Sequence, residues 1–323
     1  MYPYVSILIS TKNRRDGLNK LIDSLGKLQY PHNRFEIVII EETDTPLPVK
    51  RDTLDIQYIP IPVYHKGFGY TRNVALENAR YDIIAFTDDD CRVDANWLNN
   101  LIAPLVSDDV AGSGGAVITD GDDFLSRCET TLGFPSGGIY RQYLSLGKII
   151  PCKYLVTSNC AYKKEIVWKV GGFEVSLIYS GEDTILSEKI SKNHKCVYVP
   201  SAIVYHKPRG GILNIFNWFI RRGRSDIDVM YKMNESRLVR VKRSIIAKFL
   251  LFILSAWILG LSFPESILIF LTLYWIKTMY DRRHCIKIFH SYIFWLFLPS
   301  VKLLMDIAFD IGRILQVYNR RGL

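Results

Sequence analysis

The sequence has few features of a secreted or disulfide-stabilised protein. Its six cysteines are scattered and form no Cys-x-x-Cys pair, which predicts reduced, mostly buried thiols and neither a structural zinc site nor a disulfide framework. The first residues, MYPYVSILIST, lack the basic start and the small-residue cleavage site of a signal peptide, so the N-terminal part is expected to stay in the cytoplasm. Because 49% of its residues are hydrophobic, the chain can bury a substantial core, which excludes a disordered protein.

Positive charge is concentrated in one part of the chain. The formal net charge is +9, and 19 basic but only 7 acidic residues lie from His206 onward. This basic part is also the most hydrophobic, and its charges bracket long apolar runs. A nucleic-acid-binding protein would carry such charge on a polar surface, whereas this arrangement is typical of an anionic membrane surface. The pattern predicts a membrane as a partner and no nucleic acid.

Short apolar runs alternate with helical patterns in the N-terminal part. Strands are expected at residues 5–10, 35–40, 56–61 and 83–87, with helices at 71–79 and around Leu18, Leu21, Ile22 and Leu25. Buried, β-branched strands that alternate with helices predict an α/β fold with a doubly wound, mostly parallel sheet. In such sheets, ligands bind beyond the carboxyl ends of the strands.

Three consecutive carboxylates follow the expected strand at 83–87. Asp88, Asp89 and Asp90 stand where this strand leaves the sheet, and carboxylates so close together repel one another unless a cation lies among them. Hard oxygen ligands favour Mg²⁺ or Mn²⁺ over zinc. The alternative is a structural role, in which one aspartate ends the strand and Asp94 caps the next helix, but this does not account for three in a row.

A second acidic motif lies further along the chain. Glu182 and Asp183 follow Gly181, and a helical stretch to about Lys192 comes next. Two short strands are then expected, the first at 196–199 and the second ending near His206. The alternatives are that Asp183 only caps its helix and that His206 is an ordinary surface histidine beside Pro208.

Taken together, these motifs resemble the family 2 glycosyltransferases, whose catalytic domain has the GT-A fold. The resemblance covers residues 5–209 and rests on six blocks in order: STKNRRDGLNKLIDSL, EIVIIEE, GFGYTRNVALENARYDIIAFTDDD, SNCAYKKEIVWKVGGFE, GED and VPSAIVYH. It implies a Rossmann-like mixed sheet that binds a nucleoside-diphosphate sugar. A lone Asp-x-Asp is a weak signal, whereas six ordered blocks are a specific one.

The resemblance implies how the carboxylates near the sheet bind the donor. Asp88 and Asp90 match the Asp-x-Asp element, with Asp89 between them; Asp88 faces the ribose side, and Asp90 holds the Mg²⁺ or Mn²⁺ that bridges the diphosphate. His206 matches a histidine that completes the metal site in many relatives. The metal neutralises charge on the departing nucleoside diphosphate.

Other matched residues surround the nucleotide and the acceptor. Asp183 matches the general base that removes the proton of the acceptor hydroxyl, with Glu182 beside it at the donor site. A single base opposite the leaving group implies inversion. Thr11 and Glu41 match residues that hold the nucleobase, and Arg72 matches an arginine near the diphosphate, for which the alternative is an ordinary helix N-terminal residue.

Two departures from the family pattern limit what the resemblance implies. The second strand ends in EETDTP instead of aspartates followed by Gly-Ser, so the choice of nucleotide is open. The Gln-x-x-Arg-Trp signature of processive synthases is absent from the corresponding NWFIRRGRSD, so transfer of a single sugar is expected.

The composition changes after Arg243. Residues 245–261 are apolar and would span about 26 Å as a helix, and a second apolar run at 267–280 follows a turn at Pro264, which predicts a membrane hairpin over 245–280. Cations flank this hairpin on both sides: Arg237, Arg240, Lys242 and Arg243 before it, and Arg282, Arg283 and Lys287 after it. By the positive-inside tendency, both flanks are expected on the cytoplasmic side of the cell membrane. The alternative is a hydrophobic helical domain packed in a soluble oligomer.

A third apolar run is expected to break at Pro299. It covers residues 286–298, and an amphipathic stretch at 301–317 follows, so the segment 286–317 is expected to lie in the interface or to re-enter the membrane. The expected domains are therefore a catalytic domain at 1–210, a basic amphipathic linker at 211–243 and membrane-associated helices at 244–323.

The linker supplies candidate residues for an acceptor. Arg221, Arg222 and Arg224 alternate with aromatic residues just before the hairpin, where they are expected to contact the phosphate of a lipid-linked acceptor. The function predicted from the sequence is a membrane-anchored, metal-dependent, inverting transfer of one sugar to a lipid-linked or polyprenyl-phosphate acceptor. The alternatives are extension of a surface polysaccharide or a protein-linked glycan, and a non-catalytic membrane scaffold that keeps the fold.

Overall fold

The structure of the protein is a computed structural model that describes residues 2–63, 67–234 and 244–321. The chain divides into two compact units. The first comprises Met1–Gly121 and Gly133–Pro208, and the second comprises Asp122–Leu132 and Arg209–Leu323. Four cations expected before the hairpin, Arg237, Arg240, Lys242 and Arg243, lie outside the described residues.

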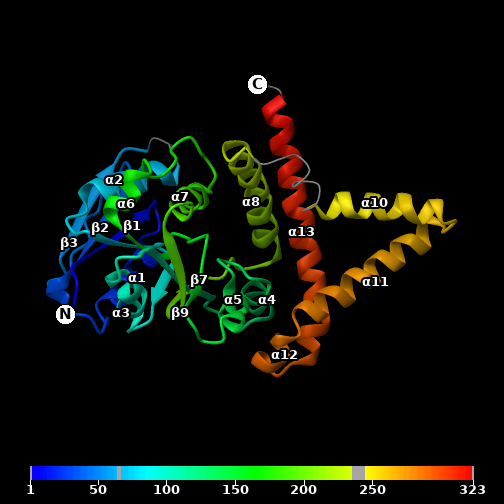
Figure 1. Ribbon diagram of the computed structural model, residues 1–323, viewed down its shortest axis with the longest axis horizontal. Helices are drawn as coiled ribbons and strands as arrows, with labels where there is room; N and C mark the ends of the chain where they lie inside the picture. Colours follow the sequence, from blue (N-terminus) through cyan, green and yellow to red (C-terminus); the bar gives the residue numbers. More distant parts are fainter. Residues whose placement is uncertain (1, 64–66, 235–243, 322–323) are drawn as a thin grey trace. The chain divides into compact units, whose positions relative to one another are not determined.

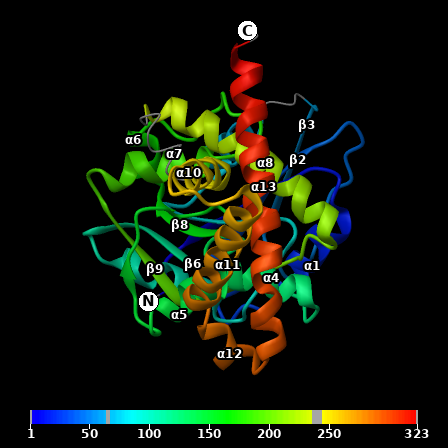
Figure 2. The same ribbon diagram turned by 90° about the vertical axis from the view of Figure 1, so that its right-hand side faces the viewer.

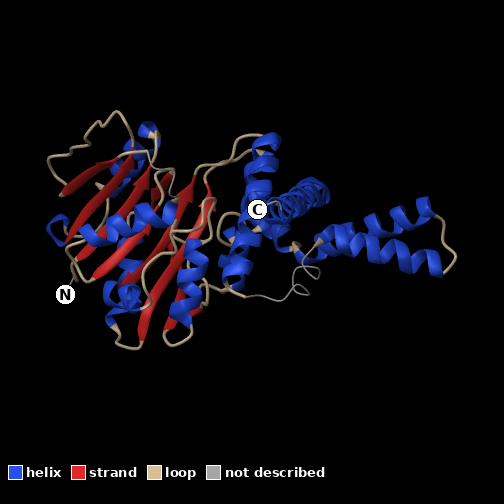
Figure 3. Ribbon diagram, turned by 90° about the horizontal axis from the view of Figure 1, so that it is seen from above, coloured by secondary structure: helices blue, strands red, loops and turns tan. Residues whose placement is uncertain are grey.

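A single mixed sheet forms the centre of the first unit (Figure 1, Figure 3). Within the described residues it has nine strands: β1 Val5–Thr11, β2 Phe35–Glu42, β3 Ile56–Ile61, β4 Ile83–Thr87, β5 Cys91–Val93, β6 Val110–Thr119, β7 Ile150–Pro151, β8 Asn159–Lys163 and β9 Lys195–His206. The order is β3-β2-β1-β4-β8-β6-β9-β5, and β7 pairs with β9. The four N-terminal strands expected from the sequence are confirmed and are parallel neighbours.

The rest of the sheet differs from the sequence expectation in two ways. β8 runs antiparallel to both β4 and β6, and β5 and β7 run antiparallel to β9, so only half of the eight strand pairings among the described residues are parallel. The sheet is the mixed one that the family resemblance implies, and not the mostly parallel one that the strand–helix alternation predicts. The two short strands expected at 196–199 and before His206 are one continuous strand, β9. It stays continuous because a register shift in the pairing, between Gly115 and Ala116 of β6, absorbs the irregularity.

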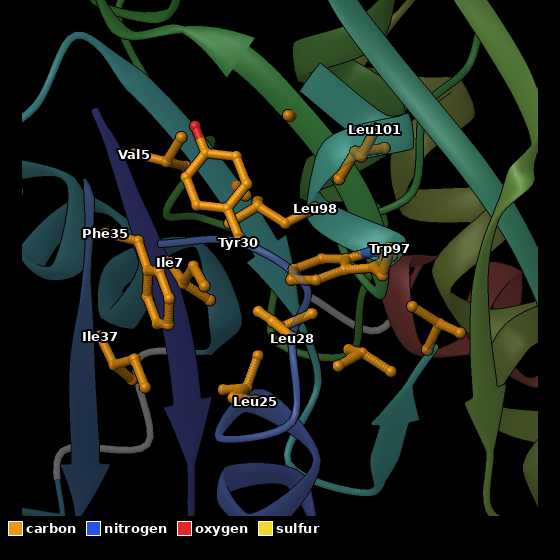
Figure 4. Close-up of a cluster of buried hydrophobic side chains, with 14 of the residues drawn as sticks. Val5, Ile7, Leu25, Leu28, Tyr30, Phe35, Ile37, Trp97, Leu98 and Leu101 are labelled. Atoms are coloured by element: carbon orange, nitrogen blue, oxygen red, sulfur yellow. The ribbon is translucent and has the colours of Figure 1, made fainter. Parts of the chain in front are cut away.

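Helices cover both faces of this sheet. They are α1 Arg15–Leu25, α2 Phe68–Asn78, α3 Trp97–Ile102, α5 Gly138–Leu144, α6 Lys164–Lys169 and α7 Glu182–Ser191, with 3₁₀ turns η1 His32–Arg34 and η2 Ala103–Val106. One hydrophobic cluster joins α1 and α3 to one face, and Figure 4 shows part of it around Trp97. A second cluster joins α2, α6 and α7 to the other face. Both clusters leave the carboxyl ends of β1, β2 and β4 at one edge.

A polar contact ties the strands together below that edge. The indole Nε1 of the fully buried Trp97 donates to Asn159 Oδ1 at 2.8 Å. The Nδ2 of Asn159 donates in turn to the carbonyls of Ala116 and Ala202. Because every one of these buried polar groups is satisfied, the contact fixes β8 against its neighbours.

The second unit is helical in its described part. Its helices are α4 Phe124–Leu132, α8 Ile212–Lys232, α10 Ile245–Ile258, α11 Phe263–Asp281, α12 His284–Phe289 and α13 Tyr292–Arg321. α8 packs along α13 (Figure 1, Figure 2). At their crossing a Cβ on Gly223 would lie 2.0 Å from the carbonyl oxygen of Phe309, and one on Gly312 would lie 2.0 Å from that of Ile220. Only glycine allows so close an approach of the two backbones.

The expected break at Pro299 is wrong, because α13 continues through it. Proline cannot donate to the carbonyl of Trp295, yet its neighbours Leu298 and Val301 are buried, so packing on both sides outweighs the lost hydrogen bond. α10 and α11 form the helical hairpin predicted over 245–280. By length and composition alone, one helix of the described residues, Tyr292–Arg320, could cross a membrane, and α10 is apolar but shorter.

Candidate functional site

The carboxyl ends of three parallel strands bring the predicted residues of the first unit to one edge of the sheet. Thr11 at the end of β1 is the register partner of Glu41 on β2. The aspartates Asp88, Asp89 and Asp90 follow β4, which lies on the other side of β1. Residues far apart in the sequence therefore meet because their strands are parallel neighbours.

Asp89 is the aspartate held most firmly by the protein. Its side chain is buried and accepts hydrogen bonds from Thr11 Oγ1 at 2.7 Å and from an Arg14 nitrogen at 3.0 Å. The same Arg14 nitrogen lies 3.0 Å from Asp90 Oδ2. Burial raises the pKa of Asp89 to about 6, although Thr11 and Arg14 act to lower it. These bonds hold the loop after β4 in place, and the Thr11 side chain is oriented by its hydrogen bond to Asp89.

Asp90 and His206 form a pair that fits a divalent cation. Cys91 on β5 is the register partner of His206 on β9, which places Asp90 Oδ1 3.3 Å from His206 Nε2. Ligand atoms of Asp90, Cys91 and His206 all lie within 4.8 Å of one another. Burial raises the pKa of the Cys91 thiol well above its usual value, and a hard divalent cation prefers oxygen and nitrogen ligands to sulfur. A carboxylate oxygen and an imidazole nitrogen remain, and this donor set suits Mg²⁺ or Mn²⁺.

Arg72 connects the two acidic motifs. Its guanidinium is buried, contacts Glu182 Oε1 and lies 3.4 Å from Asp88 Oδ1. Burial alone would lower the pKa of Arg72, but the carboxylates of Glu182, Asp88 and Asp183 together raise it. The second oxygen of Glu182, Oε2, is buried and has no hydrogen-bond partner among the described residues. Glu182 is therefore the partner of Arg72, and Arg72 is more than an ordinary helix N-terminal residue.

Asp183 is the more accessible member of its motif. α7 begins at Glu182, and its N-cap is Gly181, which has a φ of +105°, so Asp183 does not cap the helix. Its Oδ1 accepts a hydrogen bond from the backbone N–H of Thr184 at 2.7 Å. The carboxylate is half-buried, while Glu182 beside it is only 3% exposed. The two neighbouring acids therefore differ in environment, which allows them different roles.

Near Thr11 and Glu41, the site includes three residues that the sequence analysis did not predict: Tyr58, Arg14 and Arg15. Tyr58 on β3 donates to Glu41 Oε2 at 2.5 Å, and burial together with this hydrogen bond raises the pKa of its phenol. Arg15 begins α1, and both of its terminal nitrogens are buried without a hydrogen-bond partner in the described parts of the chain. The only sequence signal for Arg14 and Arg15 is their place directly after a strand that ends at the ligand-binding edge.

The three arginines predicted to contact an acceptor belong to α8 of the second unit. Arg221 and Arg222 are exposed, and the guanidinium of Arg222 lies 4.8 Å from the centre of the Trp218 ring. Arg224 is half-buried. The contact of the cation with the aromatic ring orients the Arg222 side chain on the helix surface.

The sequence pattern of glycosyl transferase family 2 matches residues 6–171, about half of the chain. The chain belongs to glycosyltransferase family 2. The structure agrees, because the mannosyltransferase PcManGT from Pyrobaculum calidifontis, solved with GDP-Man and Mn²⁺, superposes with a TM-score of 0.59 at 15% identity, over 97% of this chain and 88% of that one. A structure of residues 1–349 of S. aureus TarS superposes with a TM-score of 0.50 at 16% identity, over 99% of this chain and 92% of that one. This glycosyltransferase therefore has the GT-A fold.

Curated relatives of this glycosyltransferase match over shorter stretches. The glycosyltransferase AglE of Haloferax volcanii is 22% identical over 192 residues, 56% of this chain and 59% of AglE. The beta-monoglucosyldiacylglycerol synthase of Synechocystis sp. is 28% identical over 113 residues, 33% of this chain and 24% of that protein. The matched part thus spans less than two thirds of each of these relatives.

Proposed function

We propose that the protein is a metal-dependent, inverting glycosyltransferase that moves one sugar from a nucleoside-diphosphate sugar to a lipid-linked acceptor at the cytoplasmic face of the cell membrane. The observation that carries this proposal is the gathering of Asp88, Asp90, Arg72, Asp183 and His206 at the carboxyl edge of one sheet. A non-catalytic scaffold has no need of so many charged groups in partly buried positions.

The donor site is assigned to the carboxylates after β4 and the groups around them. Asp90 and His206 would hold Mg²⁺ or Mn²⁺, which when bound neutralises charge on the departing nucleoside diphosphate. Asp88 is assigned to the ribose side, and Arg72 to the diphosphate, where its guanidinium can exchange the contact with Asp88 for phosphate oxygens. The buried bond to Glu182 keeps Arg72 in place during this exchange.

The nucleobase is assigned to the edge formed by Thr11, Glu41 and Arg15. Glu41 is a hydrogen-bond acceptor, and Arg15 is a buried donor with no acceptor in the described parts of the chain. Because a buried cation without a partner is unfavourable, a ligand that supplies an acceptor is favoured there. A donor beside an acceptor suits a base with an N–H next to a carbonyl, as in uracil and guanine.

Asp183 is assigned the role of general base. Its side chain is half-buried, and the backbone N–H and the hydroxyl of Thr184 both donate to Oδ1. The carboxylate would accept the proton of the acceptor hydroxyl as that oxygen attacks the anomeric carbon and the bond to the diphosphate breaks. A single displacement of this kind inverts the anomeric configuration.

A lipid-linked acceptor is supported by the second unit. Its helices expose large apolar side chains, and α8 carries exposed Arg221 and Arg222 with half-buried Arg224, which suit an anionic phosphate. One relative that this chain matches is named beta-monoglucosyldiacylglycerol synthase, a name that refers to a glucosylated lipid. If Ala at all three arginines leaves the rate with a polyprenyl-phosphate acceptor unchanged, this acceptor assignment is wrong.

The experiment that tests the catalytic proposal separates donor binding from transfer. Purified protein is incubated with Mn²⁺ and a panel of UDP-, GDP- and TDP-sugars, and release of nucleoside diphosphate and thermal stabilisation are measured. Asp183→Asn should abolish transfer while donor stabilisation remains, and Asp90→Ala should remove the Mn²⁺-dependent part of that stabilisation. Asp109→Asn is the matched control, because Asp109 is exposed and paired with Lys195 on the surface. Transfer by Asp183→Asn at the wild-type rate would contradict the proposal.

A further inference from the structure

The helical hairpin and the long helix of the second unit do not run alongside each other. α10 and α11 project sideways from α13, and α11 returns to its N-terminal half through α12 (Figure 1, Figure 3). Two elements that run crosswise cannot both cross one planar bilayer. Either α13 spans the membrane and the hairpin lies along it, or the hairpin enters the membrane and α13 lies in its plane.

The C-terminal half of α13 carries the polar groups that contact α8, whereas its N-terminal half buries Leu298, Val301, Met305 and Ala308. Arg313 Nη2 lies 2.8 Å from Asp226 of α8, and Arg313 also pairs with Asp310 at 3.3 Å. Gln316 donates to both carboxylate oxygens of Asp228 at 2.9 and 3.0 Å. These polar groups form ion pairs and hydrogen bonds with one another inside the protein. α13 and α8 are therefore one helix pair, and both helices must lie at the same place relative to the membrane.

The partner helix makes a membrane-spanning α13 unfavourable. At the crossing, the close contact of Gly223 with Phe309 fixes the middle of α8 against the middle of α13. Arg221 and Arg222 precede this glycine and are exposed. A bilayer centred on the middle of α13 would therefore surround two guanidinium groups with hydrocarbon, which is unfavourable for each charge.

The outer face of α13 is apolar except for exposed Ser300. Five exposed residues recur at helical spacing: Ile293, Phe297, Ile307, Ile314 and Tyr318. The charged residues Lys302, Asp306 and Arg313 lie off this stripe. A helix that exposes an apolar stripe and keeps its charges to one side of it is the form that lies in the membrane interface. Charges confined to one side therefore favour an interfacial position of α13 over a membrane-spanning one.

The hairpin has the opposite character, because it is apolar on nearly all sides. Trp257, Ile258 and Leu259 near its tip are each more than 70% exposed, and Leu254 and Leu268 further along are also exposed. Between Lys248 and Lys277 the sequence has a single charged residue. That residue, Glu265, accepts hydrogen bonds from the backbone and hydroxyl of Ser262 in a capping box. The hairpin thus buries little of its apolar surface within the protein.

We propose that the hairpin α10–α11 is the segment embedded in the hydrocarbon of a bilayer, and that α13, with α8 behind it, lies flat in the interface. Exposed Arg283 and Lys287, next to the base of the hairpin, then face anionic headgroups, as do Arg221 and Arg222. This assignment concerns the membrane alone and stands independently of the sugar chemistry.

Depth measurements on single labels test the proposal. Leu254, Ile269, Ile293, Ile307 and Ile314 are each replaced by Cys in the full-length protein and labelled with a fluorophore, and the protein is reconstituted into phosphatidylcholine–phosphatidylglycerol vesicles. All six native cysteines are buried and free, so background labelling is low. Quenching by lipids that carry spin labels at different acyl positions gives each depth. A cooperative thermal unfolding transition at the wild-type midpoint confirms that each variant is folded.

The two arrangements give different depth patterns. Ile293 and Ile314 are separated by about 32 Å along a helix, which is about the full thickness of the hydrocarbon. We expect labels at 293, 307 and 314 to lie at one shallow depth and labels at 254 and 269 to lie deep. Depths along α13 that change by most of the bilayer thickness would overturn the proposal, as would hairpin labels that no lipid quencher reaches.

Discussion

Gly17→Ala tests whether the position of the aspartate loop governs donor binding. Gly17 lies in the first turn of α1, and a Cβ there would stand 2.6 Å from the carbonyl oxygen of Asp89. An ordinary contact needs about 3.4 Å, so one backbone must move by about 0.8 Å. Because neither atom belongs to a flexible side chain, the movement displaces Asp89 and Asp90 relative to β1.

The expected effects follow from that displacement. A misplacement of about 1 Å in a catalytic site can cost up to about 100-fold in rate, so we expect kcat/KM to fall by roughly tenfold. Stability should fall by about 1–3 kcal/mol, as for other overpacked sites. The assay is Mn²⁺-dependent release of nucleoside diphosphate over a range of donor concentrations, with thermal denaturation of each variant.

Gly26→Ala is the matched control at the other end of the same helix. Its added Cβ would lie 3.6 Å from the nearest atom, and its φ of −65° suits any residue. The control should keep wild-type kinetics and gain slightly in stability from the better helix former. The reasoning is refuted if Gly17→Ala retains the wild-type kcat/KM, or if both variants lose activity equally.

Two further predictions concern buried charges. Glu182→Gln removes the carboxylate that contacts the buried Arg72 guanidinium, so the free energy of unfolding should fall by about 3 kcal/mol. The double variant with Arg72→Met should recover part of this loss. Denaturant titration measures both variants, and a double variant less stable than either single one contradicts the pairing. Burial raises the pKa of Glu129 from 4.5 to about 7, so the folded protein keeps a proton that the unfolded chain releases, and stability falls as pH rises through this window. At about 1.4 kcal/mol per pH unit the loss is about 3 kcal/mol, and Glu129→Gln should remove it. Denaturation at pH 5 and pH 8 shows the difference, and an unchanged pH dependence in Glu129→Gln would exclude this cause.

The sequence predicted those parts of the fold that depend on local pattern. The runs at 5–10, 35–40 and 83–87 are continuous and apolar, and each is a strand of the central sheet. The placement of Asp88, Asp89 and Asp90 at the sheet edge followed from parallel neighbours alone, since such strands end on the same side. The pairing of α10 with α11 was predicted because Pro264 separates two apolar runs.

Strand direction and continuity were harder to predict, because they depend on partners distant in the sequence. Residues 159–163 carry no signal that β8 must run antiparallel, and the direction is set by β4 and β6 on either side. β9 reads as two strands because Pro200 interrupts its apolar run, but pairing with β6 carries it across. Pro299 did not end α13, because the packing of its buried neighbours Leu298 and Val301 outweighs the lost hydrogen bond.

The contacts within the site could not be predicted from spacing. Arg14 bonds to Asp89, 75 residues away, and Arg72 bonds to Glu182, 110 residues away. Such pairs form only when the fold has brought their elements together. Glu182 is an example. The family resemblance placed it at the donor site, and only the structure shows that its carboxylate contacts the Arg72 guanidinium.

The central claim is that the carboxylates after β4 bind the metal of a sugar donor. The most direct measurement is a crystal structure with a nucleoside-diphosphate sugar and Mn²⁺, with diffraction data collected at the manganese absorption edge. The account predicts an anomalous peak at coordination distance from Asp90 and His206, with the diphosphate beside it. A diphosphate bound elsewhere, with no manganese near these two residues, would contradict it.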